Sequence, residues 1–251
     1  MSLPTKEEAL AELNAIQKEQ REYVKNVGIE YRFGCYEEKR ADSCHLLGEF
    51  TEAIEQNFKA ALNLFRDNCV QRDYPKSCYK YAMYLLHGKE VEPSFARMVR
   101  PLEVACKGDL PPACRYLGLV HWNGDENKTP PNSGKAEEAM LKACELEDPE
   151  ACWLLSTWYL GPEAKFAKHK MESKHKKPLG QLQRDVEKAL AYGIRACDLN
   201  VPQACANVSR MYRVGDGIPK NPDKSKEYIE KATAIVDLLR SREATPDFTG
   251  S

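Results

Sequence analysis

The stretch Ala143–Cys152, ACELEDPEAC, holds two cysteines eight positions apart with an Asp-Pro break between them. Asp148 is a suitable helix N-cap, and Pro149 fits the first position of the helix that follows. In a continuous helix, eight residues would separate the two cysteine Cα atoms by about 12 Å, whereas a disulfide needs them within about 7 Å. The break turns the chain back, so the stretch predicts a junction where the end of one helix lies beside the start of the next.

The same kind of pair recurs five times, and no cysteine is left over. Four of the breaks contain proline, and in the first pair we expect Asp42 and Ser43 to make the break instead. The second cysteines recur at steps of 34, 36, 38 and 53 residues, and a regular step in the thirties indicates a helical repeat. The pairs are Cys35 and Cys44, Cys69 and Cys78, Cys106 and Cys114, Cys144 and Cys152, and Cys197 and Cys205.

The sequence after each second cysteine has a common pattern. A small residue stands four positions later, at Gly48, Ala82, Gly118, Ser156 and Ser209. This pattern predicts a helix with a notch for close contact with another helix. A glycine ten positions later, in three of the units, is typical of a helix end. A second helix, such as EEAMLKAC, then leads into the next pair. We therefore predict an all-α fold, an α/α solenoid of five helix-turn-helix repeats.

The domain organisation follows from these repeats. Residues 1–30 are expected to form an N-terminal capping helix, with apolar residues at Leu10, Leu13 and Ile16. Residues 31–241 are expected to form the solenoid as a single domain, ending in a helix from about Lys224 to Arg240. Residues 242–251 are expected to be a flexible tail.

The bulk composition excludes several classes of function. The formal net charge is −1, from 37 basic and 38 acidic residues, which gives no support to a nucleic-acid-binding surface. No apolar run approaches the roughly 20 residues of a transmembrane helix. The N-terminal segment has no apolar core of a secretory signal. We expect a monomer without a transmembrane segment.

Three chemistries could explain the cysteine pairs. Zinc sites favour cysteines two to four residues apart, and none of these pairs has that spacing. No C-x-x-C motif of a thioredoxin-type redox site is present either. Five structural disulfides are the preferred interpretation, each worth about 2.5 kcal/mol in the loop-entropy model. Reduced thiols packed as small apolar groups remain the alternative.

The sequence shows no catalytic constellation, and we expect a protein that is not an enzyme. It contains no phosphate-binding loop, no G-x-G-x-x-G motif and no Ser-His-Asp order. Five histidines occur, and the simplest interpretation is packing or helix-terminal roles. The alternative is a haem ligand, for which the candidates are His87, His121, Met83 and Met211.

A basic segment interrupts the fourth repeat at residues 161–178, GPEAKFAKHKMESKHKKP. Its simplest interpretation is a solvated loop. The alternative is a docking loop for an acidic partner or for lipid head groups.

The last repeat, NVSRMYRVGDGIPKNPDKSKEYIEKA, resembles a Sel1-like repeat, a TPR-like module. Together with RACDLNVPQACANVSRMYRVGDG and the five cysteine pairs, it resembles the mitochondrial Sel1-like family of cytochrome c oxidase assembly factors. The resemblance covers about Tyr31 to the C-terminus. It implies that the ten cysteines are the inter-helix disulfides of the family. The long fourth repeat departs from the usual repeat length.

The resemblance also implies a location and partners. It points to the mitochondrial intermembrane space, to respiratory complex IV assembly proteins or subunits as partners, and to the oxidative import machinery of that space. Disulfides need an oxidising compartment, which agrees with this location; the alternative is the cytosol, with reduced thiols. Two functions remain open: a scaffold acting by protein–protein interaction, and a haem-binding thiol-disulfide redox factor acting on copper-delivery proteins of complex IV.

Overall fold

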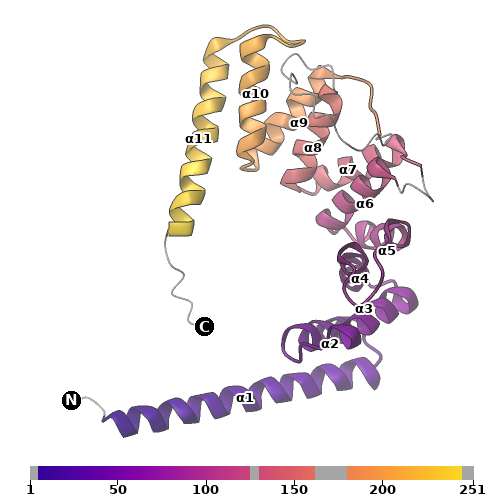
Figure 1. The fold of residues 1–251 in the computed structure, drawn as a ribbon, viewed down its shortest axis with the longest axis vertical. Helices are drawn as coiled ribbons and strands as arrows, with labels where there is room; N and C mark the ends of the chain where they lie inside the picture. The colour runs from indigo at the N-terminus through magenta and orange to yellow at the C-terminus, as the bar shows by residue number, and fades with distance from the viewer. Residues whose placement is uncertain (1–4, 125–129, 162–179, 245–251) are drawn as a thin grey trace. The chain divides into compact units, whose positions relative to one another are not determined.

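The computed structural model describes residues 5–124, 130–161 and 180–244, and within these ranges every regular element is an α-helix. Figure 1 shows the helices in chain order. They are α1 (Lys6–Tyr36), α2 (Ala41–Ala53), α3 (Phe58–Arg72), α4 (Pro75–His87), α5 (Phe95–Lys107), α6 (Pro111–Asn123), α7 (Ser133–Glu145), α8 (Pro149–Leu160), α9 (Val186–Asp198), α10 (Pro202–Val214) and α11 (Pro222–Ala244). The all-α repeat fold predicted from the cysteine spacing is confirmed.

The chain divides into two compact units. Unit 1 comprises Met1–Ser94 and contains α1 to α4, and unit 2 comprises Phe95–Ser251 and contains α5 to α11. Within each unit, every helix packs against its neighbours in sequence. The single-domain solenoid over residues 31–241 stays a prediction. The helix expected at the N-terminus runs on to Tyr36 and so includes Cys35.

Local sequence signals start most of these helices. In α1, Thr5 and Glu8 form a capping box, in which each side chain accepts a hydrogen bond from the backbone N–H of the other. Five other helices begin with a side-chain oxygen that accepts from the N–H three residues later, at Asn57, Asn132, Asp148, Asp185 and Asn221. Proline occupies the first position of α4, α6, α8 and α10, where its missing N–H costs no hydrogen bond.

The five junctions between a first and a second cysteine share one backbone feature. Each contains one residue other than glycine with positive φ, and this residue always stands five positions before the second cysteine: Lys39, Asp73, Asp109, Glu147 and Asn200. The next helix begins two residues after it in every case. The left-handed residue thus makes the turn, and proline fixes only the start of the following helix.

This geometry corrects one expectation. Asp42 and Ser43 do not make the break in the first junction, because α2 begins at Ala41 and both residues lie inside the helix. The N-cap residue is Arg40, and its side chain makes no capping hydrogen bond. The turn at Lys39 is sufficient without proline or an N-cap side chain.

The small residues after the second cysteines are where the two helices of a repeat meet. A Cβ atom on Gly48 of α2 would lie 2.5 Å from the Phe65 ring of α3, and one on Gly118 of α6 would lie 2.9 Å from Met140 of α7. In α8, the Ser156 hydroxyl donates to the Ala189 carbonyl of α9 at 2.7 Å. The notch predicted from the sequence therefore sets how closely the paired helices approach.

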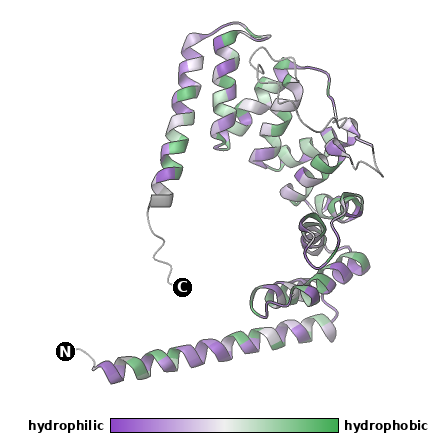
Figure 2. Cartoon of the chain, viewed as in Figure 1, coloured by the Kyte–Doolittle hydropathy of each residue, from purple (hydrophilic) through white to green (hydrophobic). Residues whose placement is uncertain are grey.

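The core of each unit lies along these contacts. Figure 2 shows apolar and polar residues alternating along most helices, as expected for amphipathic packing. In the loop after α10, Asp216 is only 2% exposed and pairs with Arg184 at 2.7 Å. Among the described helices, none combines the length and hydrophobicity needed to cross a bilayer.

Candidate interaction site

The ten cysteines lie in five pairs at disulfide distance, in the pairing that the spacing predicts. The Sγ–Sγ distances run from 2.00 to 2.12 Å and the Cα–Cα distances from 4.4 to 4.8 Å. Each pair joins the end of one helix to the first turn of the next: α1 to α2, α3 to α4, α5 to α6, α7 to α8 and α9 to α10. The first bridge therefore joins the N-terminal helix to the first repeat, and each of the other four joins one repeat to the next.

The cysteine residues are nearly or completely buried, although Cys106 lines a cavity in unit 2. No cysteine residue is more than 6% exposed, and both residues of the Cys144–Cys152 bridge are fully buried. Exchange with another thiol requires a thiolate to reach a sulfur atom along the S–S axis. The geometry thus favours a structural role for the bridges over exchange chemistry, while the state of the cysteines in the cell stays a prediction.

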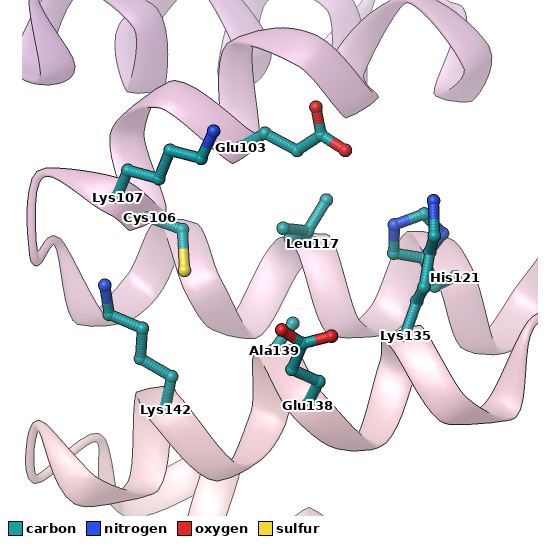
Figure 3. Close-up of a pocket in the computed structure, with 9 residues that line it drawn as sticks. All are labelled: Glu103, Cys106, Lys107, Leu117, His121, Lys135, Glu138, Ala139 and Lys142. Atoms are coloured by element: carbon teal, nitrogen blue, oxygen red, sulfur yellow. The ribbon is translucent and has the colours of Figure 1, made fainter.

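A cavity of about 380 Å³ opens between α5, α6 and α7 in unit 2. Figure 3 shows its lining side chains projecting from all three helices. Leu117, Ala139 and the disulfide sulfur of Cys106 give it an apolar floor, and charged side chains surround that floor. The complete lining is Glu103, Cys106, Lys107, Leu117, His121, Lys135, Glu138, Ala139 and Lys142.

The charges around the cavity are ordered along it. Figure 3 shows Lys107 and Lys142 on opposite walls at one end, with Lys135 beside His121 at the other end. Glu103 and Glu138 lie on opposite walls between them. Lys142 also pairs with Asp109 at 2.8 Å. An apolar floor with a few polar groups around it is the usual composition of a ligand-binding pocket.

His121 contributes a polar but uncharged group to this cavity near neutral pH. Burial is the main reason that the pKa of His121 is lowered from its usual value; nearby Lys135 lowers it further, and Glu103 opposes the shift. His121 is only 8% exposed to solvent. Its carbonyl oxygen accepts from the N–H of Asn132, the N-cap residue of α7, at 2.7 Å, which joins the end of α6 to the start of α7.

The four haem-ligand candidates are divided between the two units, and their role as ligands stays a prediction. Met83 and His87 lie one turn apart on α4, where His87 is exposed to solvent. In unit 2, Met211 is completely buried in α10, and His121 lines a cavity whose other polar groups are lysines and glutamates. A haem needs an apolar slot with an accessible ligand atom, and the residues around these candidates do not fit that requirement.

The described residues contain no cluster of three or more His, Cys, Asp or Glu side chains that could hold a metal ion.

The basic segment at residues 161–178 lies outside the described residues except for its first residue, Gly161.

One buried polar cluster was not apparent in the sequence. His45 is 6% exposed, and its Nδ1 atom lies 3.1 Å from the Ser77 hydroxyl. The amide of Asn68 donates to the same hydroxyl and to the Ala41 carbonyl, both at 2.8 Å. Ser77 is completely buried, so this cluster joins α2, α3 and α4 rather than forming a site for substrate.

The fold and the junctions together define a Sel1-type helical repeat protein, bridged between repeats. The Sel1 repeat pattern matches residues 41–66, 75–97, 111–148, 176–201 and 202–234. Solved structures show the same fold. A Sel1 repeat protein from Oxalobacter formigenes has a TM-score of 0.68 at 15% identity, covering 86% of this chain and 82% of that one. The antigen c5321 of uropathogenic Escherichia coli, described as displaying an SLR fold, has a TM-score of 0.66 at 15% identity. The match covers 93% of this chain and 52% of the antigen.

Curated relatives identify the branch of this fold. Cytochrome c oxidase assembly factor 7 of Xenopus tropicalis is 30% identical over 231 residues, or 90% of this chain and 93% of that protein. The Drosophila melanogaster homologue is 32% identical over 251 residues, covering 91% and 93%, and the human protein is 30% identical over 225 residues, covering 87% and 90%. The chain belongs to the cytochrome c oxidase assembly factor 7 family of Sel1 repeat proteins.

Proposed function

We propose that this chain is a non-enzymatic assembly factor for cytochrome c oxidase, respiratory complex IV, and that it acts by binding assembly proteins or subunits of that complex. The observation that carries the proposal is its likeness, over about nine tenths of its length, to relatives named for this role. A helical repeat scaffold suits such a role, because it presents an extended surface to a protein partner.

The cavity between α5, α6 and α7 is the proposed contact site for the client. Its apolar floor at Leu117 and Ala139 would take an apolar side chain. The lysines at one end would pair with a carboxylate of the client, and the glutamates in the middle would accept hydrogen bonds from its backbone. The near-neutral chain offers little long-range attraction, so we expect local fit to dominate the affinity.

The proposed compartment is the mitochondrial intermembrane space. Five disulfide-distance pairs in one chain are typical of an oxidising compartment. The oxidative import machinery of that space is then the partner that forms the bridges. We expect the fold to be stabilised by the bridges at its junctions, so import and folding would be completed together.

The test is depletion of the protein, followed by native-gel measurement of complex IV and rescue with variants. A double variant, Lys107→Glu with Glu138→Lys, reverses the charge on both cavity walls. Both positions are exposed, and the net charge of the chain does not change. The matched control is the double variant Lys226→Glu with Glu230→Lys, which reverses an exposed ion pair on α11.

We expect depletion to lower complex IV, the control variant to restore it, and the cavity variant to be equally abundant but to fail in rescue. Normal complex IV after complete depletion would refute the assembly role. Full rescue by the cavity variant would remove the cavity from the proposal and leave the role itself standing.

A further inference from the structure

Helix α1 exposes a stripe of large apolar side chains on the side turned away from α2. Ile29, Phe33 and Tyr36 are 54%, 58% and 52% exposed, and their spacing of four and three residues places them on one helix face. The opposite side packs on α2 through Gly28, where a Cβ atom would lie 2.7 Å from the Phe50 ring, and through Cys35. The stripe therefore takes no part in the packing of unit 1.

The later repeats provide an internal comparison for this stripe. Relative to the first cysteine of each pair, the three residues stand six and two positions before it and one position after it. In the four later helices that carry a first cysteine, nine of the twelve equivalent residues are polar or charged, and the others are valine or alanine. They are Asn63, Asp67, Val70, Arg100, Val104, Lys107, Glu138, Lys142, Glu145, Ala191, Arg195 and Asp198.

The equivalent helix face borders a binding cavity in unit 2. Glu138 and Lys142 of α7 stand at the positions of Ile29 and Phe33, and both project into the cavity between α5 and α7 (Figure 3). On α1 the same positions have no facing helix in unit 1. A terminal helix of a repeat stack normally has a polar outer face, so an aromatic and aliphatic stripe at this place indicates a surface that another molecule covers.

Charge on the same face identifies the chemistry of that molecule. Steps of seven residues join Glu12, Glu19, Asn26 and Phe33 in one row, and Ala15, Glu22, Ile29 and Tyr36 in the adjacent row. These two rows are thus acidic in their N-terminal half and apolar in their C-terminal half. All of these residues are exposed. The basic residues Lys18, Lys25 and Arg32 form a separate row at the edge of the face.

We infer that this face of α1 docks a helix of a partner protein, one that carries Lys or Arg at one end of its contacting face and large apolar side chains at the other. The face from Glu12 to Tyr36 is about 36 Å long, which suits a partner helix of about 24 residues. Apolar anchors at spacings of three and four residues are the standard means by which one helix recognises another. The glutamates select a basic partner and speed its approach.

The experiment uses the purified, disulfide-bonded full chain and a fluorescein-labelled synthetic peptide of about 24 residues. One face of the peptide carries Lys and Arg in its first half and Leu in its second half. Two control peptides carry either Glu in place of the basic residues or Ser in place of Leu. Fluorescence anisotropy should show saturable binding of the first peptide that weakens with salt, and binding at least about tenfold weaker for both controls.

Two variants of the chain locate the binding. Ile29→Ser with Phe33→Ser removes the stripe, and Glu19→Lys with Glu22→Lys reverses the acidic half. The matched controls are Val70→Ser, an exposed apolar residue on α3, and Glu227→Lys with Glu230→Lys, an exposed pair with the same spacing on α11. Because all of these side chains are exposed, circular dichroism and melting curves should match those of the parent chain.

We expect each α1 variant to lose at least about tenfold in affinity and each control to retain it. Equal affinity for all variants, or equal binding of the Glu-containing peptide, would overturn the inference. So would sedimentation analysis showing that the parent chain dimerises and that the Phe33 variant does not, because the occupant would then be a second copy.

Discussion

The contact between Gly48 and Phe65 offers a sharp test of how the two helices of a repeat meet. In Gly48→Ala, the new Cβ atom would lie 2.5 Å from one ring carbon of Phe65 and 2.9 Å from two others. Unstrained carbon contacts lie near 3.5–4.0 Å, so the ring or the helix must move by about 1 Å. The Phe65 ring is completely buried and packs against His45 and Tyr84, which leaves it little freedom to do so.

The size of the effect follows from two opposing contributions. Overpacking of a well-packed core lowers the free energy of unfolding by about 1–3 kcal/mol. Replacing glycine with alanine inside a helix raises it by up to about 1 kcal/mol. We expect Gly48→Ala to lower the free energy of unfolding by about 1–2 kcal/mol, measured by urea denaturation followed by circular dichroism. The matched control is Gly134→Ala in α7, where the nearest atom to a new Cβ is the Asn132 side-chain oxygen at 3.7 Å.

A double variant separates overpacking from other causes. Phe65→Leu alone should destabilise by creating space, and adding it to Gly48→Ala should cost less than the sum of the two single changes, because the smaller side chain relieves the clash. If Gly48→Ala proves as stable as Gly134→Ala, or if the two changes at positions 48 and 65 are simply additive, the close helix approach described for unit 1 is wrong.

Three further predictions concern the junctions and the buried polar groups. Replacing Cys144 and Cys152 with serine should lower the melting temperature by about 5–10 °C and increase protease cleavage nearby; an unchanged melting curve would argue against a structural bridge. Asp148→Ala should cost about 2 kcal/mol, because Asp148 both caps α8 and pairs with Arg115 at 3.0 Å, whereas Glu150→Ala, which removes the exposed partner of Arg115, should cost under about 0.5 kcal/mol. Burial lowers the pKa of His45, and this shift is opposed by Glu49 and assisted by Lys76 and Lys80. The unfolded chain then binds the proton more readily, so the free energy of unfolding should fall as pH drops below about 6.5. His45→Gln should reduce that fall, and an unchanged pH dependence in this variant would contradict the assignment.

The junctions could be predicted from the sequence because their chemistry is local. Asp148 and Pro149 stand next to each other at a helix start, and the cysteines on either side are close enough in sequence for a turn to bring them together. The turn residue itself could not be predicted. Lys39 and Glu147 have no preference for positive φ, whereas Asp73, Asp109 and Asn200 are of residue types that adopt it more often. At Lys39 and Glu147 the conformation is therefore imposed by the two helices and the bridge.

The remaining features depend on contacts between residues far apart in sequence. Arg115 meets Asp148 from 33 positions away, and the cavity beside His121 exists only because three helices place their side chains around it. The cluster of His45, Asn68 and Ser77 likewise joins three helices. Periodicity shows that these positions are near a buried face, but it does not show which side chains meet.

The most direct test of the bridged-repeat fold is a disulfide map of the protein isolated from cells. Free thiols are alkylated at the moment of lysis, and non-reducing peptide mapping then identifies every bridged pair. The fold described here predicts five bridges, each between a cysteine and its neighbour eight or nine positions away, with no alkylated thiol. Alkylation of the cysteines throughout, or bridges between cysteines of different junctions, would contradict it.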